Sequence, residues 1–468
     1  MKKKSRIHVH WIISVGVATL FALELYPFTP RAFGLSIEEE RVLGEKFVAE
    51  VRSHFELIED DFAVRYINGL GRQLTANLET RPFPFHFYII RDNTVNAFAA
   101  PGGHIFVFSG LIGVTDNLDE LASVICHEIG HVSARHLSER LEQGKKIGLA
   151  TLAGILAGAL IGGPVAQALM AGSMAAGIQT QLHYSRNDER QADQLGSQYM
   201  ASLGLDPSAG ITILRKIERE SWLGTDKVPA YLLTHPSGPE RMANLDALVS
   251  HLTRQHPSRA LDPYRKRFPY FKTLIQAKQM DFQTAETLFN RELTKNPGAP
   301  LPDFGLGIVY KDQSDYEKAA YHLKKALEAE PHFVPLLRDL GEVYQLMGKN
   351  NEAVAIFQKA LELDEADKPT LYLLALSYEN LGQHQEAIDI LERLAALRPV
   401  KREVYYHLGI SYGRQDRLGL AHYNFGIYFK SLHQPDKAAF HFRKALEVSQ
   451  NDPHLKKKIH EAMGKKPS

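Results

Sequence analysis

Cysteine is almost absent from this sequence of 468 residues, which contains only Cys126. A single cysteine excludes an internal disulfide, so folding must rest on the hydrophobic core and on any metal that the chain binds. Cys126 precedes His127, but neighbouring side chains on a helix point in different directions. We therefore expect Cys126 to be a buried packing residue and not a metal ligand.

An excess of charge of either sign is also missing, since 55 Lys and Arg residues stand against 54 Asp and Glu residues. A balanced chain has no long-range field that attracts nucleic acid, so we expect no nucleic-acid partner. Hydrophobic residues make up 44% of the chain, which is enough to bury a full core. The length predicts about two or three domains.

Hydrophobic runs long enough to span a bilayer are missing at the start of the chain. After the basic stretch MKKKSR, residues 11–23 carry no charge, but a spanning helix needs about 20 apolar residues. A basic start, a short apolar run and the small-x-small stretch Ala32-Phe33-Gly34 follow the order of a secretory signal peptide. We predict a signal peptide over residues 1–34 and an exported mature chain. An uncleaved membrane anchor is the alternative.

Charged residues are missing from residues 147–183, which contain no Asp, Glu, Lys or Arg. Gly163-Pro164 interrupts this segment, and each half is too short to cross a bilayer. We expect two short helices that form a lid, with peripheral membrane contact left open. A membrane hairpin is the alternative.

The segment before the lid combines helices with a small sheet. Ser36 and Glu39 fit a capping box at the start of a helical pattern over residues 36–78. From residue 83 the chain is rich in aromatic and β-branched residues, and Gly102-Gly103 separates two strand-like runs. Helical spacing returns over residues 119–140. We predict an α-rich domain with a small β-sheet over residues 35–255.

A repeat of 34 residues fills the C-terminal part of the chain. The alanine column consists of Ala285, Ala319, Ala353, Ala387 and Ala421, and glycine, tyrosine, aromatic and proline columns recur in register with it. This period and these residue types are those of tetratricopeptide repeats, so we predict an α-solenoid over residues 264–468. The second-helix pattern recurs after only 17 residues at Ala438, so one helix near the end should serve two units. Such arrays present a concave surface to peptides or proteins.

The stretch HEIGH places His127 and His131 four residues apart, with Glu128 beside the first histidine. On a helix, side chains four residues apart lie on one side, so the two imidazoles can bind one Zn²⁺. Glu128 would reach a water at the metal and can act as the general base that hydrolyses a peptide bond. Because the chain has 21 histidines, the pattern can also arise by chance. Its small and apolar neighbours favour a buried active-site helix.

A second helix downstream offers a third ligand. The stretch SRNDERQAD places Glu189 and Asp193 one turn apart. Glu189 can complete a site of two histidines and one glutamate that leaves a fourth position open. Asp193 can hold the far ring nitrogen of a ligand histidine. The alternative is a solvated, charge-rich helix face.

HEIGHVSARH, followed after a glycine-rich apolar insert by SRNDERQAD, resembles the HExxH metallopeptidase family that includes the CAAX prenyl protease and the HtpX heat-shock protease. The preceding VNAFAAPGGHIFVFSGLI is similar to that family's strand-and-turn element, and the resemblance covers residues 37–252. It implies an α-rich HExxH zincin fold that holds one zinc ion per chain. It also implies His127, His131 and Glu189 as zinc ligands and Glu128 as general base.

The order of signal peptide, peptidase and repeats resembles that of periplasmic members of the family. This resemblance implies quality control of outer-membrane protein assembly, with unfolded or misassembled proteins as substrates. It further implies that the repeats recruit substrate or an outer-membrane β-barrel assembly machinery. The alternative from another class is a periplasmic chaperone or scaffold with a latched or inactive protease site.

The stretch LLTHPSGPERM contributes His235 and Arg241. The resemblance implies that His235 is a removable fourth zinc ligand that keeps the enzyme quiet, and a structural turn histidine is the alternative. We predict that Arg241 stabilises the oxyanion of the transition state. Pairing of Arg241 with a carboxylate is the alternative. His104 and His136 are expected to be hydrogen-bonding or surface histidines and not ligands.

Substrate binding is expected at a sheet edge, where an extended chain can add as a strand through main-chain hydrogen bonds. We predict that residues 105–108 lie at such an edge and that residues 96–100 belong to the same element. The candidate substrate-binding residues are Asn96, Ala97, Phe98, Ile105, Phe106 and Val107. Main-chain recognition would tolerate many sequences, so access to the site would limit cleavage.

Overall fold

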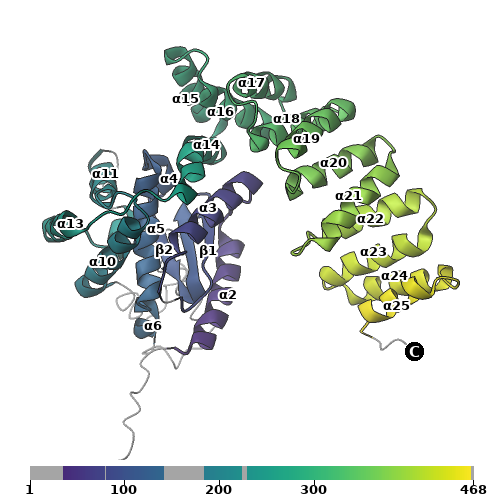
Figure 1. Cartoon of the computed structure of the whole chain (residues 1–468), viewed down its shortest axis with the longest axis horizontal. Helices are drawn as coiled ribbons and strands as arrows, with labels where there is room; N and C mark the ends of the chain where they lie inside the picture. The colour runs from purple at the N-terminus through teal and green to yellow at the C-terminus, as the bar shows by residue number, and fades with distance from the viewer. Residues whose placement is uncertain (1–34, 80, 142–183, 224–228, 465–468) are drawn as a thin grey trace, which may run out of the picture.

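The computed structural model describes residues 35–79, 81–141, 184–223 and 229–464 of the chain. The predicted signal peptide (1–34) and the predicted lid (147–183) lie outside these residues. The described part is mainly helical with one small sheet, as the sequence predicts. Figure 1 shows a helical body around the sheet, followed by a curved row of helix pairs that ends at α25. Across the described ranges, no helix has the length and apolar character needed to cross a membrane.

The N-terminal body contains the sheet and the helices around it. Its elements are α2 (Ile37–His54), α3 (Asp61–Leu74), β1 (His86–Ile90), β2 (Ala97–Ala100), η1 (Pro101–Gly103), β3 (His104–Phe108), α4 (Ser109–Val114), α5 (Leu118–Ser133), α6 (His136–Leu141), α10 (Arg186–Ser202), α11 (Ala209–Leu223), α12 (Ala230–Thr234), α13 (Pro239–His251) and η3 (Arg259–Leu261). Ser36 and Glu39 form the predicted capping box at the start of α2. Gly102 and Gly103 both have positive φ, so the tight turn between β2 and β3 requires glycine.

The sheet has the strand order β1-β3-β2, with β1 parallel and β2 antiparallel to β3. The prediction that residues 105–108 lie at a sheet edge is therefore wrong, because β3 pairs on both sides. The sequence of β3 itself indicates a central strand. All five residues of β3 are buried, and a strand buried on both faces is a continuous apolar run without polar alternation.

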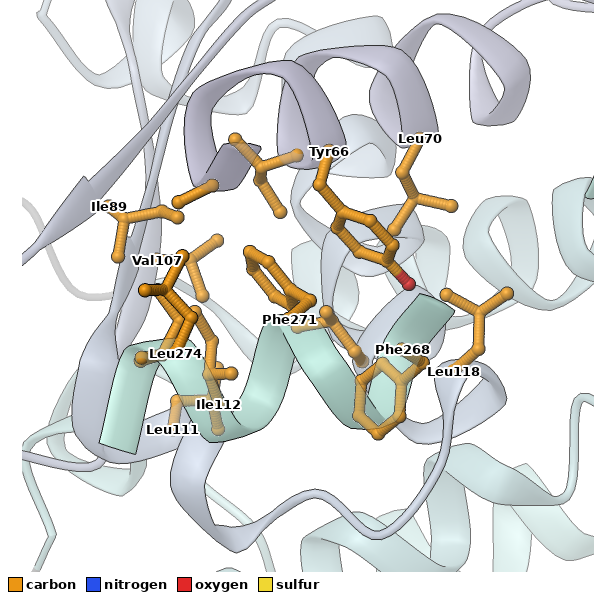
Figure 2. Packing of buried hydrophobic residues seen from close by; sticks show 14 of the residues in the cluster. Tyr66, Leu70, Ile89, Val107, Leu111, Ile112, Leu118, Phe268, Phe271 and Leu274 are labelled. Atoms are coloured by element: carbon orange, nitrogen blue, oxygen red, sulfur yellow. The ribbon is translucent and has the colours of Figure 1, made fainter. Parts of the chain in front are cut away.

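Helix α14 (Asp262–Gln279) begins beyond the predicted end of the peptidase domain, yet it is part of that domain's core. Phe268, Phe271 and Leu274 of α14 are buried. The Phe271 ring stacks on Tyr66 of α3 with 4.2 Å between centroids, and Figure 2 shows these α14 side chains among those of α3, β3 and α4. One hydrophobic cluster runs from Ile58 in the N-terminal body into the repeats. The predicted boundary at residues 255–264 thus does not separate two independent cores.

The repeats follow α14 as antiparallel helix pairs. Their helices are α15 (Phe282–Lys295), α16 (Pro300–Asp312), α17 (Tyr316–Ala329), α18 (Val334–Leu346), α19 (Asn350–Leu363), α20 (Lys368–Asn380), α21 (His384–Ala396), α22 (Glu403–Arg414), α23 (Leu418–Ser431), α24 (Pro435–Val448) and α25 (Pro453–Ala462). A Cβ at Gly341 would lie 2.4 Å from the Phe357 ring, and one at Gly426 would lie 2.4 Å from the Phe442 ring. Glycine therefore allows each close helix contact, and α23 serves two units as the sequence predicts.

Candidate metal centre

The HEIGH motif lies near the end of α5, where its polar side chains are buried. The helix begins after Asn117, whose side chain accepts a hydrogen bond from the backbone N–H of Glu120. Apolar residues of α5 belong to the main hydrophobic cluster and fix the helix inside the body. His127 and His131 therefore present their rings to one place from successive turns, with 4.7 Å between ring centroids.

Two further side chains reach the same place from distant parts of the chain. Glu189 comes from α10, and His235 directly follows α12. Together with His127 and His131 they bring candidate ligand atoms within 4.8 Å of one another. Nε2 of His127 lies 3.0 Å from Nε2 of His131 and 3.3 Å from Nδ1 of His235. Oε1 of Glu189 lies 3.0 Å from Nδ1 of His235 and 3.4 Å from Nε2 of His131.

These separations fit a tetrahedral metal site. Four ligand atoms at about 2.0–2.1 Å from a zinc ion stand about 3.3 Å from each other, close to the 3.0–3.4 Å seen here. Three imidazole nitrogens and one carboxylate oxygen are also donors that zinc prefers. Burial lowers the pKa of His131 well below its ordinary value, so its ring is held in the neutral form that binds metals. The donor set therefore fits one zinc ion.

The far ring nitrogens of both motif histidines face polar groups. Oδ1 of Asp193 lies 2.9 Å from Nδ1 of His127, the position that the sequence suggests for it. Nδ1 of His136 lies 3.0 Å from Nδ1 of His131, and its other nitrogen lies 3.1 Å from Oε1 of Gln191. His136 thus stands behind a candidate ligand and outside the group of four. Such contacts fix the rotation and tautomer of the rings.

The charges around His127 favour its protonated form in the metal-free chain. Burial lowers the pKa of His127, but the hydrogen bonds and charges of Asp193 and Glu189 outweigh burial and raise it to about 9. Burial likewise raises the pKa of Asp193, and His127 and Arg241 outweigh it and hold that pKa at about 2. A metal ion would replace the proton on His127 as the positive charge facing these carboxylates.

Arg241, near the start of α13, is buried and contacts both acidic groups. Its Nε and one terminal nitrogen donate to the two carboxylate oxygens of Asp193 at 2.9 and 2.8 Å. Its other terminal nitrogen lies 2.6 Å from Oε2 of Glu189 and donates to the backbone carbonyls of His235 and Pro236 at 3.4 and 3.3 Å. These contacts are those of the carboxylate-pairing alternative. The oxyanion role of Arg241 stays a prediction.

Glu128 lies on the other side of the His235 ring and is fully buried. Its Oε1 is 3.4 Å from Nε2 of His235, whereas Nδ1 of the same ring faces Glu189. The His235 ring therefore stands between the candidate base and the candidate ligands. The latch role of His235 stays a prediction.

Two tyrosines that sequence analysis missed enclose this arrangement. The Tyr231 ring stacks on His235 with 4.7 Å between centroids and an angle of 23°. The Tyr184 ring lies 3.8 Å from the His131 ring and 5.2 Å from the His235 ring. Tyr231 stands four residues before His235, and this helical spacing was the signal that could have found it.

The two edges of the sheet differ in what covers them. On the β1 edge, the Asn68 side chain donates to the carbonyl of Phe87 at 3.0 Å and accepts from the N–H of Phe87 at 3.2 Å. The N–H of Ile58 donates to the carbonyl of Ile89 on the same edge. Among the strands that the structure describes, none pairs with the outer side of β2. The sheet thus has one closed edge at β1 and one edge without a strand partner at β2.

The ladder shows which groups face the outer edge of β2. The N–H of Phe108 donates to the carbonyl of Asn96 at 3.0 Å, so Asn96 and every second residue after it bond to β3. Val95, Ala97 and Ala99 therefore turn their N–H and carbonyl groups outward. Of the residues predicted to bind substrate, Ala97 alone has its peptide groups on this edge. The central-strand residues Ile105, Phe106 and Val107 pair with β1 or β2 and cannot accept another strand.

Comparison with known proteins agrees with this site and with the repeats. Residues 64–249 match the model of peptidase family M48, and residues 372–421 match that of the tetratricopeptide repeat. Residues 312–394 match the model of anaphase-promoting complex, cyclosome, subunit 3. The fold and the site define a metallopeptidase domain followed by repeats. The matched residues 64–249 contain all four candidate ligands.

Curated relatives carry protease names. The chain is 35% identical over 260 residues to the beta-barrel assembly-enhancing protease of Yersinia pestis, covering 54% of this chain and 53% of that protein. It is 30% identical over 301 residues to the protein of the same name from Escherichia coli (strain K12), covering 64% and 61%. It is 27% identical over 238 residues to the mitochondrial metalloendopeptidase OMA1 of Schizosaccharomyces pombe, covering 49% and 68%. The chain spans about half to three fifths of the first two relatives.

A solved structure is also similar. The crystal structure of MamA protein has 26% sequence identity and a TM-score of 0.26, and the match covers 35% of this chain and 95% of that one.

Proposed function

We propose that the chain is a zinc endopeptidase that is exported to the periplasm and removes unfolded or misassembled proteins. The observation that carries this proposal is the convergence of three imidazoles and the Glu189 carboxylate at tetrahedral spacing, with Glu128 beside them. When bound there, zinc supplies a Lewis acid that activates water and polarises the scissile carbonyl.

Glu128 is the group that moves protons in this proposal. It accepts a proton from the attacking water and passes it to the leaving amine. Among the described residues, neither of its carboxylate oxygens has a hydrogen-bond partner, and Nε2 of His235 lies 3.4 Å from one of them. A buried carboxylate without competing donors is available to take a proton once His235 withdraws. Asp193 and Arg241 position the ligands.

The β2 edge is the proposed place for the substrate. An extended chain that adds to β2 would bond to the outward peptide groups of Ala97 and Ala99. Because β2 packs beside α5 in the same core, such a chain would pass close to the HEIGH helix. Recognition would rest on main-chain groups, which suits clients of varied sequence.

His235 acts as a latch in the resting state. It holds the fourth corner of the site and blocks the space beside Glu128. This arrangement also supports the alternative, a chaperone or scaffold whose protease site stays latched. Cleavage by the parent chain separates the two functions, because a peptidase whose latch opens for clients degrades them, whereas a site that stays latched does not cleave while His235 is present.

The proposed cellular role is quality control of outer-membrane protein assembly. The names of the Yersinia and Escherichia relatives support this role. The repeats would recruit clients or the outer-membrane β-barrel assembly machinery through their concave surface.

The decisive test compares Glu128→Gln with Glu139→Gln, a substitution of an exposed carboxylate on α6. Cleavage of β-casein should be lost in Glu128→Gln and retained in Glu139→Gln, in both the parent and the His235→Ala chain. Zinc content should stay at about one ion per chain in all of them. Undiminished cleavage by Glu128→Gln would refute the mechanism. Reduced cleavage by His235→Ala would make His235 catalytic and not a latch.

A further inference from the structure

The outer edge of β2 has one hydrogen bond in the structure that bears on the latch. The backbone N–H of Tyr231 donates to the carbonyl of Val95 at 3.3 Å. Val95 lies two residues before Ala97, so its carbonyl points outward from the sheet like those of Ala97 and Ala99. The first turn of α12 thus occupies part of the edge that a substrate strand would use.

Tyr231 connects this edge to His235 by two further contacts. Its carbonyl accepts a hydrogen bond from the backbone N–H of His235 at 2.8 Å, and its ring stacks on the His235 ring. Tyr231 is only 1% exposed and His235 is fully buried. A short helix with these contacts moves as a unit, so displacement of Tyr231 from Val95 also pulls on His235.

We propose that Tyr231 is a positioning residue that makes strand addition at β2 and coordination by His235 mutually exclusive. A substrate strand that reaches Val95 must replace the N–H of Tyr231 as the hydrogen-bond donor to the Val95 carbonyl. The displacement of Tyr231 releases the latch. The latch then opens when a client binds, without a separate activator. This inference rests on the proposed protease function and on the β2 edge as its substrate site.

Linkage gives the proposal a binding test that is independent of cleavage. If coordination by His235 weakens strand binding by a certain factor, removal of His235 must strengthen strand binding by that same factor. We compare the zinc-loaded Glu128→Gln chain with the same chain that also carries His235→Ala. The second chain should bind β-casein about fivefold more tightly, because one net hydrogen bond changes an affinity by about that factor. The matched control is His251→Ala, an exposed histidine on α13, which should leave the affinity unchanged.

A second substitution locates the gain in affinity. Ala99→Pro removes an outward N–H from β2 and leaves the ladder with β3 intact. It should cancel the tighter binding of the His235→Ala chain. If the gain persists with Ala99→Pro, it does not arise at this edge, and the proposal fails.

Substitutions that remove or keep the aromatic ring test the role of Tyr231. Tyr231→Leu should raise both β-casein affinity in the Glu128→Gln chain and cleavage in the active chain, because the stack that holds His235 is lost. Tyr231→Phe keeps the ring and should return the affinity towards the parent value. Equal affinities of these two variants would contradict the positioning role of the ring.

The failure of this inference differs from the failure of the proposed function. If the His235→Ala chain cleaves β-casein but the affinities of the Glu128→Gln chains do not change, the coupling is refuted and the peptidase stands. If neither the parent nor the His235→Ala chain cleaves β-casein, the peptidase function is itself refuted.

Discussion

At the scale of single residues, the site is a group of buried polar side chains that compensate one another. Asp193 faces His127 on one side and Arg241 on the other. Arg241 contacts both Asp193 and Glu189. It therefore connects the candidate ligand Glu189 to the carboxylate that faces His127. The orientation of each ligand therefore depends on residues that do not reach the metal.

We expect Asp193→Asn to weaken zinc binding by about tenfold or more, because Nδ1 of His127 loses its charged partner. Competition with a chromophoric chelator measures this affinity. Asp246→Asn, which changes an exposed carboxylate on α13, is the control. Equal zinc affinities of the two variants would show that Asp193 does not support the ligand.

Removal of zinc should lower the thermal unfolding temperature of the parent chain. Zinc binds the folded site and not the unfolded chain, so its binding free energy adds to stability. We expect the melting temperature to fall with a chelator and to recover when zinc is added in excess. In His127→Ala the same additions should have little effect. A zinc-independent melting temperature in the parent would contradict a zinc site in this group.

At the scale of elements, the fold treats its two sheet edges differently. At the β1 edge, the Asn68 carboxamide forms hydrogen bonds with both the N–H and the carbonyl of Phe87. These bonds replace those of a strand that would otherwise pair there. An edge closed in this way is protected from association with other strands. Within the described part of the chain, the backbone hydrogen bond at the β2 edge is the one from Tyr231 to Val95, just before the strand, and this difference is what favours β2 for the substrate.

Asn68→Ala should destabilise the protein by about 1–3 kcal/mol, because both peptide groups of Phe87 lose their partner. Urea unfolding measures this change in the free energy of unfolding. Arg72→Ala, at an exposed position of the same helix, controls for helix effects. We also expect more self-association from Asn68→Ala in light scattering. A free energy of unfolding equal to that of the control would show that the edge is not held by Asn68.

At the scale of the whole molecule, peptidase and repeats share one core. Besides α14, the N-terminal part of α3 packs on the repeats, where the Phe62 ring lies 5.3 Å from that of Phe333. Arg65 pairs with Asp367, which also accepts from Arg338 at 3.3 Å. The repeats are therefore held at a fixed angle to the catalytic body and do not hang from a flexible linker.

Phe271→Ala should destabilise the protein by about 3–5 kcal/mol, because it leaves a cavity between α14 and α3. Peptidase and repeats should still unfold in one transition, followed by intrinsic fluorescence and circular dichroism. Phe440→Ala removes a half-exposed ring of α24 and should change stability by about 0.5 kcal/mol or less. A chain that ends at residue 255 should aggregate, since it lacks α14. Soluble, folded protein from that chain would contradict a shared core.

The sequence by itself determined the parts of the protein that repeat or that lie close together along the chain. The column of Ala285 and its successors fixed the solenoid, and the spacing of His127 and His131 fixed one face of a helix, because periodicity alone sets which side chains share a face. Only the tertiary structure decided how distant segments meet. It made β3 the central strand, placed α14 in the catalytic core and brought Tyr231 between Val95 and His235. These outcomes depend on packing between elements far apart in sequence, and no local pattern records that packing.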